Sequence, residues 1–305
     1  MNTELPMCLL DWIDKDKINW SHLSYNPNAI ALLKENPLQI DWGYLSANPC
    51  AEAIALLKEN HLQIDWFNLS SNSSLDAVAL LKENPDKINW FNLSLNPTAE
   101  AIALLKENPL QIHWLNLSRN PEAIALLKEN PDKINWIWLS SNPSAVALLK
   151  ENPDKINWSG LSSNPTAEAI ALLKEHPDKI DWTMLSLNPN AIALLKENPD
   201  KINWYNLSRN KNAEAIALLK ENPLQIDWTM LSLNPNAIEL LKANPDKINW
   251  TYLSSNPSIF TDDYEKMRYN CLLFKEDLMK ERFHPRNLRK FGLWGHNGGI
   301  DDDEE

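Results

Sequence analysis

Tryptophan recurs along this chain at two fixed intervals, and this regularity constrains the fold more than any other feature. Five of the ten intervals are 22 residues long, as from Trp20 to Trp42, and five are 24, as from Trp42 to Trp66. Units of this length, repeated in tandem, are supersecondary elements that bury their apolar faces by stacking on one another. Eleven Trp residues mark one frame, NPxAIALLKENPDKINWxxLSxNP: Trp20, Trp42, Trp66, Trp90, Trp114, Trp136, Trp158, Trp182, Trp204, Trp228 and Trp250.

The two extra residues of the longer units always fall at one place in the frame. NPNAIALL begins at Asn26, whereas NPCAEAIALL begins at Asn48. Two residues inserted in the middle of a helix would rotate its apolar face by about 200°. Two residues added in the first turn only lengthen the helix, so the frame tolerates them there.

Each unit carries signals for a first helix of about three turns. Asn26 occupies the N-cap position and Pro27 the first helical position, where both residue types are favoured. Ile30 and Leu33 then belong to an apolar stripe at helical spacing. Pro37 ends the helix, because the residue before a proline is pushed out of the helical region.

A second, shorter helix is predicted after the first. Asp41 provides the cap, and Trp42 and Leu45 lie one turn apart on the same face. Helices this short are marginal in water, so each must pack against its neighbours. The two helices of each unit therefore stack along the array.

The predicted fold is all-α, a right-handed α-solenoid of eleven 22–24-residue two-helix repeats with helical N- and C-terminal caps. At 8–10 Å between packed helices, it would form a curved rod on the order of 100 Å long with Trp and Leu ladders in its core. The expected divisions are an N-terminal cap (1–19), the tandem-repeat solenoid (20–256), a helical C-terminal cap (257–300) and a disordered acidic tail (301–305).

Composition excludes several classes of function. The chain of 305 residues has a formal net charge of -12, which argues against nucleic acid as a partner because neutralising phosphates requires a basic surface. Three isolated cysteines without CxxC spacing indicate a reducing compartment. No secretion signal and no apolar run long enough to span a membrane occurs, so we expect a protein that is neither secreted nor transmembrane.

The KENPDKINWxxLSxNPNAI unit, followed by an FHPRNLRKF-like tail, resembles tandem Trp/Asn-Pro repeat proteins of giant DNA viruses, the nucleocytoplasmic large DNA viruses. The resemblance covers nearly the whole chain. It implies a viral protein located in the host cytoplasm or the virion, and it brings no catalytic residues with it. Three units depart from the pattern, with Ser73 and Lys211 in place of the first helical proline and His61 in place of the loop proline.

No residue pattern indicates catalysis, a metal or a cofactor. His113 occupies the slot that Asn or Asp fills in other units, so we expect it to act as a variant cap. No His pair has metal-ligand spacing, and the Asp and Glu residues recur in every unit as solvated helical faces do. Neither a nucleophile elbow nor a phosphate-binding glycine loop is present. The sequence therefore predicts a protein that is not an enzyme.

Three positions, one, two and five residues after each frame Trp, vary most between repeats. They share one side of the second helix, and their aromatic, Met, Asn and Arg side chains are typical of protein interfaces. We predict that they form one strip that binds a protein partner. The candidate partner-binding residues are Tyr44, Phe67, Asn68, Phe91, Asn92, Asn116, Arg119, Trp138, Met184, Tyr205, Arg209, Met230 and Tyr252.

Two alternatives remain beside a non-enzymatic scaffold that binds a host or viral protein through this strip. The variable side chains could instead pack between adjacent repeats. The protein could also be a structural component of a virus particle, with most of its surface buried. An RNA-binding repeat is disfavoured, because the regular alternation of basic and stacking side chains that it needs is not seen.

Overall fold

The computed structural model describes residues 6–282, in which the chain divides into two compact units. The larger unit is Leu9–Phe260 and the smaller combines residues 6–8 with 261–282. The larger unit is a helical repeat array, in which short helices that begin at the frame Trp or near the frame proline pack one on the next. The repeats are numbered here from one at Trp20 to eleven at Trp250.

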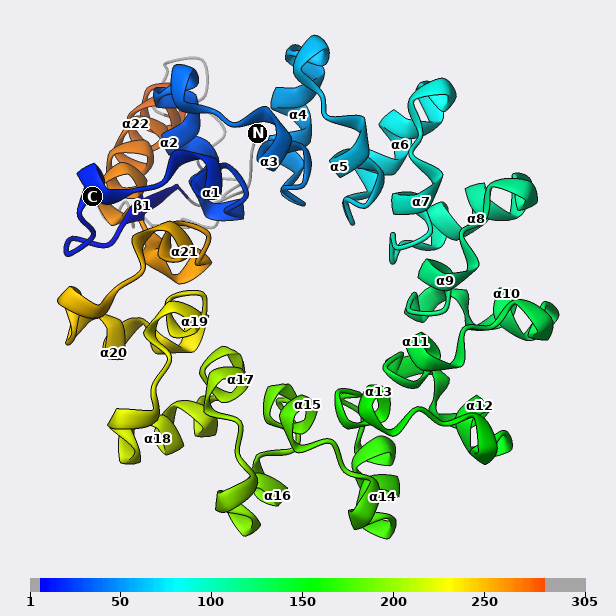
Figure 1. Cartoon of the computed structure of the whole chain (residues 1–305). Coiled ribbons are helices and arrows are strands. Elements are labelled where there is room, and N and C mark those ends of the chain that lie inside the picture. The colour runs from blue at the N-terminus through cyan, green and yellow to red at the C-terminus, as the bar shows by residue number, and fades with distance from the viewer. Residues whose placement is uncertain (1–5, 283–305) are drawn as a thin grey trace, which may run out of the picture. The chain divides into compact units, whose positions relative to one another are not determined.

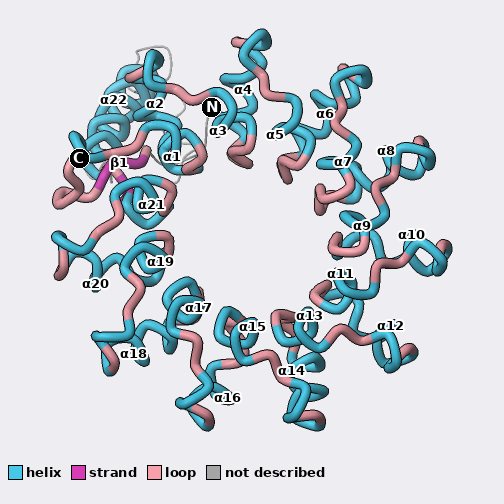
Figure 2. The backbone as a smooth tube through the Cα atoms, in the orientation of Figure 1, coloured by secondary structure: helices cyan, strands magenta, loops and turns pink. Residues whose placement is uncertain are grey.

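The helices form two concentric layers in the larger unit (Figures 1 and 2). Each inner helix begins at a frame Trp. The inner layer consists of α1 (Trp20–Ser24), α3 (Trp42–Ser46), α5 (Trp66–Ser70), α7 (Trp90–Leu93), α9 (Trp114–Leu117), α11 (Trp136–Ser140), α13 (Trp158–Ser162), α15 (Trp182–Leu187), α17 (Trp204–Arg209), α19 (Trp228–Ser232) and α21 (Trp250–Ser254).

The outer helices carry the IALLKE sequence and show how the two interval lengths arise. Units with 24-residue intervals have outer helices of nine residues: α4 (Ala51–Glu59), α6 (Leu75–Glu83), α8 (Ala99–Glu107), α14 (Ala167–Glu175) and α18 (Ala213–Glu221). Units with 22-residue intervals have five or six: α2 (Ile30–Glu35), α10 (Ile124–Glu129), α12 (Val146–Glu151), α16 (Ile192–Glu197) and α20 (Ile238–Lys242). The extra residues lengthen the first turn, as the sequence predicts.

Short 3-10 turns connect the layers. One precedes each inner helix: η1 (Lys15–Lys17), η3 (Pro37–Gln39), η4 (His61–Gln63), η5 (Pro85–Lys87), η6 (Pro109–Gln111), η8 (Pro131–Lys133), η10 (Pro153–Lys155), η11 (Pro177–Lys179), η12 (Pro199–Lys201), η13 (Pro223–Gln225) and η15 (Pro245–Lys247). Five others begin at the frame proline: η2 (Pro27–Ala29), η7 (Pro121–Ala123), η9 (Pro143–Ala145), η14 (Pro235–Ala237) and η16 (Pro257–Ile259).

The predicted caps are present at the inner helices. The Asp41 carboxylate accepts a hydrogen bond from the Tyr44 backbone N–H at 3.1 Å. At α9 the predicted variant cap His113 accepts through Nδ1 from Asn116 N–H, at 3.4 Å. Each cap satisfies one of the backbone donors that the first turn of a helix leaves free.

The core between the layers is made of Leu, Ile and Ala. Leu45 and Leu57 are fully buried, and so is Ala53, which lets the layers approach closely. The frame Trp residues are mostly buried, and each keeps part of its side chain exposed. The expected Trp ladder therefore flanks the core, and leucines fill its centre.

Asparagine and serine side chains tie each repeat to the one before it. Asn48 Nδ2 donates to the carbonyls of Ser24 and Asn26, both at 3.0 Å. Ser24 Oγ donates to the Trp20 carbonyl and accepts from Asp41 N–H. The frame Asn before the proline and the frame Ser four residues after Trp are present in all eleven repeats, and all are buried.

The array closes on itself, which corrects the expectation of an open rod. Helix α1 packs against α21, as Figure 1 shows. Asn26 Nδ2 donates to the carbonyls of Ser254 and Asn256 at 3.2 and 2.9 Å, and Asn19 N–H donates to Ser254 Oγ. The hydrogen bonds that join consecutive repeats thus also join the eleventh repeat to the first. We call this junction the seam.

The smaller unit differs from the predicted helical caps. Strands β1 (Met7–Leu9) and β2 (Phe260–Asp262) pair with one another, and Asp263 N–H donates to the Pro6 carbonyl at 2.7 Å. Over its described residues, 6–19, the N-terminal cap is therefore not helical, apart from the 3-10 turn η1. The C-terminal cap does contain a helix, α22 (Tyr264–Arg282). The remainder of that cap and the predicted acidic tail, residues 301–305, lie outside the described residues.

Candidate binding site on the inner wall of the ring

The inner helices present one side to the outer helices and the opposite side to the opening of the ring. Successive residues of a helix are 100° apart, so the first and fifth residues after Trp point away from the third. The third is the core leucine: Leu93 is fully buried, while Phe91, two residues earlier, is 48% exposed. The first and fifth residues after each frame Trp therefore face the opening, and we call them the inner wall.

The opening is wide enough for a peptide chain. Neighbouring packed helices lie about 9 Å apart, which places eleven of them on a circle about 30 Å across. Half the width of a helix on each side leaves an opening of about 20 Å. An extended segment or a single helix of a partner fits inside it.

The inner wall carries no acidic residue in a chain with 41 of them. Among the first and fifth residues after the eleven frame Trp, the only charged side chains are Arg119 and Arg209. Arg119 stacks on the Trp138 ring, with 4.3 Å between the guanidinium carbon and the ring centroid. The wall of the opening thus differs in charge from the rest of this acidic protein.

One arc of the inner wall is apolar. The first residue after Trp is a large hydrophobic side chain in repeats three to six, and these four are exposed by 41–59%: Phe67, Phe91, Leu115 and Ile137. In the remaining repeats this position is Ser, Gly or Thr, apart from Tyr205. Consecutive apolar side chains of this kind are unusual on a surface that contacts only water.

The structure divides the sequence-predicted site residues into three groups. Tyr44, Phe67, Phe91, Arg119, Trp138, Tyr205 and Arg209 are exposed, and Asn68, Met184 and Tyr252 are half-buried. Asn92, Asn116 and Met230 are buried, with at most 9% of their surface exposed. These three are therefore not available to a partner, and predicting them as binding residues was wrong.

The second residue after each Trp points sideways to the preceding repeat, which explains the burial. Asn92 Nδ2 donates to the Phe67 carbonyl at 2.7 Å, and Asn116 Nδ2 to the Phe91 carbonyl at 2.9 Å. Asn68 makes the same bond to Gly43 at 3.1 Å. At this position the asparagine side chains pack between adjacent repeats, which is the alternative to a role in partner binding.

Aromatic contacts occur at three of the repeat junctions. The rings of Phe91 and His113 lie 4.5 Å apart. The His22 ring lies 5.3 Å from that of Tyr44 in repeat two. Across the seam it lies 5.9 Å from the ring of Tyr252, and His22 Nδ1 lies 2.9 Å from Ser255 Oγ. These rings connect neighbouring repeats as well as lining their surface.

The described residues offer little for covalent or metal chemistry. Burial, followed by a 2.8 Å hydrogen bond to Glu52, raises the pKa of the Cys50 thiol to about 11, so it is protonated at neutral pH. Within residues 6–282 no three His, Cys, Asp or Glu side chains are grouped to hold a metal ion. None of the helices described there has the length and hydropathy needed to cross a membrane.

The fold places this chain among helical repeat proteins, a class defined by stacked short helices. Comparison with known proteins takes the assignment no further, since no family model, curated protein or solved structure matches the chain.

Proposed function

We propose that the protein is a non-enzymatic interaction scaffold, and that its inner wall binds a segment of a host or viral protein. The observation that carries this proposal is the run of exposed apolar side chains from Phe67 to Ile137 in repeats three to six. Aromatic residues are enriched in the cores of protein interfaces, and a few buried anchor residues supply most of the binding energy. The right-handed sense of the solenoid and the viral origin belong to the same proposal, and both rest on the sequence alone.

The proposed contact is tested at Phe91, on the inner wall, and at Trp138, an exposed side chain that follows the inner-wall residue Ile137. The double variant Phe91→Ala, Trp138→Ala should weaken partner binding by more than about 2 kcal/mol, or about thirtyfold in Kd. Leu110→Ala is the matched control, because Leu110 is 97% exposed but lies on the turn η6, outside the inner wall. A photo-crosslinking amino acid at position 91 should form adducts with a partner in a lysate of the producing cells, and one at position 110 should not.

Equal partner binding by wild type and the double variant, measured by titration with the crosslinked partner, contradicts the proposal. So does crosslinking of equal yield at positions 91 and 110. Thermal melts of each variant separate lost binding from lost folding. Neither Phe91 nor Trp138 is part of the buried core, so the melting temperature should change little.

The alternative is a structural component of a virus particle, and one observation favours it. Four leucines outside the inner wall replace the Asp of the PDK turns, and they are 86–98% exposed: Leu38, Leu62, Leu110 and Leu224. Such side chains suit a protein with several faces buried in an assembly. Mass spectrometry of purified particles decides this point, because a structural component is present in stoichiometric amounts.

A further inference from the structure

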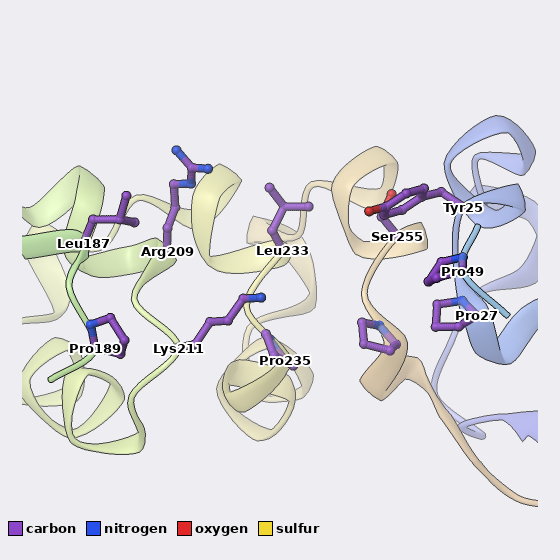
Figure 3. Close-up of a pocket in the computed structure, with 11 residues that line it drawn as sticks. Tyr25, Pro27, Pro49, Leu187, Pro189, Arg209, Lys211, Leu233, Pro235 and Ser255 are labelled. Carbon is purple, nitrogen blue, oxygen red and sulfur yellow. The ribbon is translucent and has the colours of Figure 1, made fainter. Parts of the chain in front are cut away.

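A groove crosses the repeats on both sides of the seam. It has a cavity volume of about 700 Å³ and is lined by residues from repeats eight to eleven, one and two. Figure 3 shows two rows of side chains along it. One row is the fifth residue after each frame Trp and the other is the frame proline or its replacement, among them Leu187, Arg209, Leu233, Pro189, Lys211 and Pro235.

The proline row is held in place by amide side chains. Asn190 Nδ2 donates to the Pro165 carbonyl and Asn212 Nδ2 to the Pro189 carbonyl, each at 2.6 Å. Asn236 donates to the Lys211 carbonyl and Asn28 to the Pro257 carbonyl. Asn occurs at this position in repeats one, eight, nine and ten and in no other repeat. These hydrogen bonds join the backbone segments of successive repeats that border the groove.

Repeat nine gives this apolar groove its positive charge. Arg209 occupies the fifth position after Trp, and Lys211 stands where nine of the other ten repeats have proline. Both side chains are exposed, and no carboxylate among the described residues forms an ion pair with either one. Arg119 of repeat five, by contrast, is stacked on Trp138. The groove thus combines apolar rows with two cations that are available to a ligand.

We infer that this groove binds an extended peptide segment of the partner, in which apolar side chains recur at every third residue and carboxylates face Arg209 and Lys211. The inference rests on the proposed function, since it names a binding site on the same scaffold. It is independent of the apolar arc in repeats three to six.

The spacing of the repeats favours this kind of peptide. A polyproline-II chain rises about 3.1 Å per residue with three residues per turn, so every third side chain recurs on one side after about 9 Å. Neighbouring packed helices, and with them the leucines and prolines of successive repeats, are about 8–10 Å apart. An extended peptide can therefore place one apolar side chain on each repeat. Phosphate-rich nucleic acid lacks the matching apolar side chains.

The test is a selection of random twelve-residue displayed peptides on the full chain, followed by fluorescence anisotropy with the enriched peptide. We expect enriched peptides to carry Asp or Glu together with apolar residues three apart. Arg209→Ser and Lys211→Pro each restore a residue that other repeats have at that position, and Lys211 N–H makes no backbone hydrogen bond within the described structure that proline would remove. Each should raise the Kd about threefold to fivefold, as exposed ion pairs do.

Lys106→Ser is the matched control, because Lys106 is an exposed cation on the outer helix α8, outside the inner wall and the groove, and its loss should leave the Kd unchanged. Rising salt should weaken binding to wild type and have little effect on the double variant Arg209→Ser, Lys211→Pro, which lacks both cations. Selection that enriches no peptide, enriched peptides without acidic residues, or an unchanged Kd in the double variant would each overturn the inference. Crosslinking at position 91 that persists in the double variant then shows that the proposed function stands although the groove does not bind. If the folded protein without the groove substitutions forms no crosslink from position 91, that result counts against the proposed function and not against the groove.

Discussion

An interior junction of the ring and the seam use the same hydrogen bonds across very different distances along the chain. At the interior, Asn142 Nδ2 donates to the carbonyl of Asn120, 22 residues earlier, at 2.9 Å. At the seam, Asn26 Nδ2 donates to the carbonyl of Asn256, 230 residues later, at the same distance. Lys17 lies over Trp250 at the seam as Lys247 lies over Trp228 inside the array. The seam therefore repeats the hydrogen bonds and the cation–π contact of an interior junction.

What closes the ring is the angle that each repeat adds. Eleven repeats complete a turn when each contributes about 33°, and the same packing is then available between the eleventh and the first. The seam does differ at one position. His22 occupies the place where repeats three, four, five and nine have an asparagine, and its ring meets Ser255 instead of a backbone carbonyl.

The largest expected effect comes from the core leucines on the two sides of this comparison. Leu139→Ala at the interior and Leu23→Ala next to the seam remove side chains that are both fully buried. Each should lower the free energy of unfolding by roughly 2–5 kcal/mol, because the loss of buried methyl groups leaves a cavity. Urea denaturation followed by circular dichroism measures both values. A much smaller effect for Leu23 than for Leu139 means that the seam is open in solution.

A smaller effect is expected from the frame asparagines, whose side chains join consecutive repeats. Asn142→Ala and Asn26→Ala each leave two buried carbonyls without their donor, which should cost roughly 1–3 kcal/mol. Asn28→Ala is the control at the seam, since Asn28 is half-buried and makes a single bond across it, at 3.0 Å. Equal losses for Asn26 and Asn142 support a closed ring. A loss confined to Asn142 breaks the comparison.

The smallest effect sharpens what is particular to the seam. His22→Asn places the interior residue at the seam, where its amide can reach the Thr251 carbonyl as Asn92 reaches that of Phe67. We expect the free energy of unfolding to change by less than about 0.5 kcal/mol. A loss above about 1 kcal/mol would show that the contacts of His22 with Ser255 and Tyr252 hold the seam together.

Local signals predicted the elements of the repeat well. Asp41 and its equivalents begin the inner helices, and Pro27 and Pro37 mark the start and the end of the outer segment, because caps and prolines act through nearest-neighbour geometry. The frame Trp residues are mostly buried, as their place on the apolar face predicts, and each keeps some exposed surface because so large a side chain is rarely covered completely. The paired strands β1 and β2 could not be predicted, because their sequences show no alternation of apolar and polar residues.

Closure and part of the site depend on angles that no local pattern encodes. A few degrees more or less per repeat would convert the ring into an open helix, and the sequence of one repeat does not reveal that angle. Phe91 was correctly expected to be exposed. Asn92, its neighbour, was expected beside it but is buried, because the direction of the preceding repeat decides which of two adjacent side chains is covered. Ser24 and its equivalents recur in every repeat, and this recurrence was the sequence signal for the hydrogen bonds that join consecutive repeats.

The seam also changes how the molecule comes apart. In an open stack, a terminal repeat has one neighbour and detaches at the cost of one interface, so such arrays fray from their ends. In the ring formed by Leu9–Phe260 every repeat has two neighbours, so the first local opening must break two interfaces at once. The backbone amides of repeats one, six and eleven should therefore be protected from hydrogen exchange to a similar degree. A peptide bound inside the ring can dissociate only along the ring axis or through a rare opening of the ring.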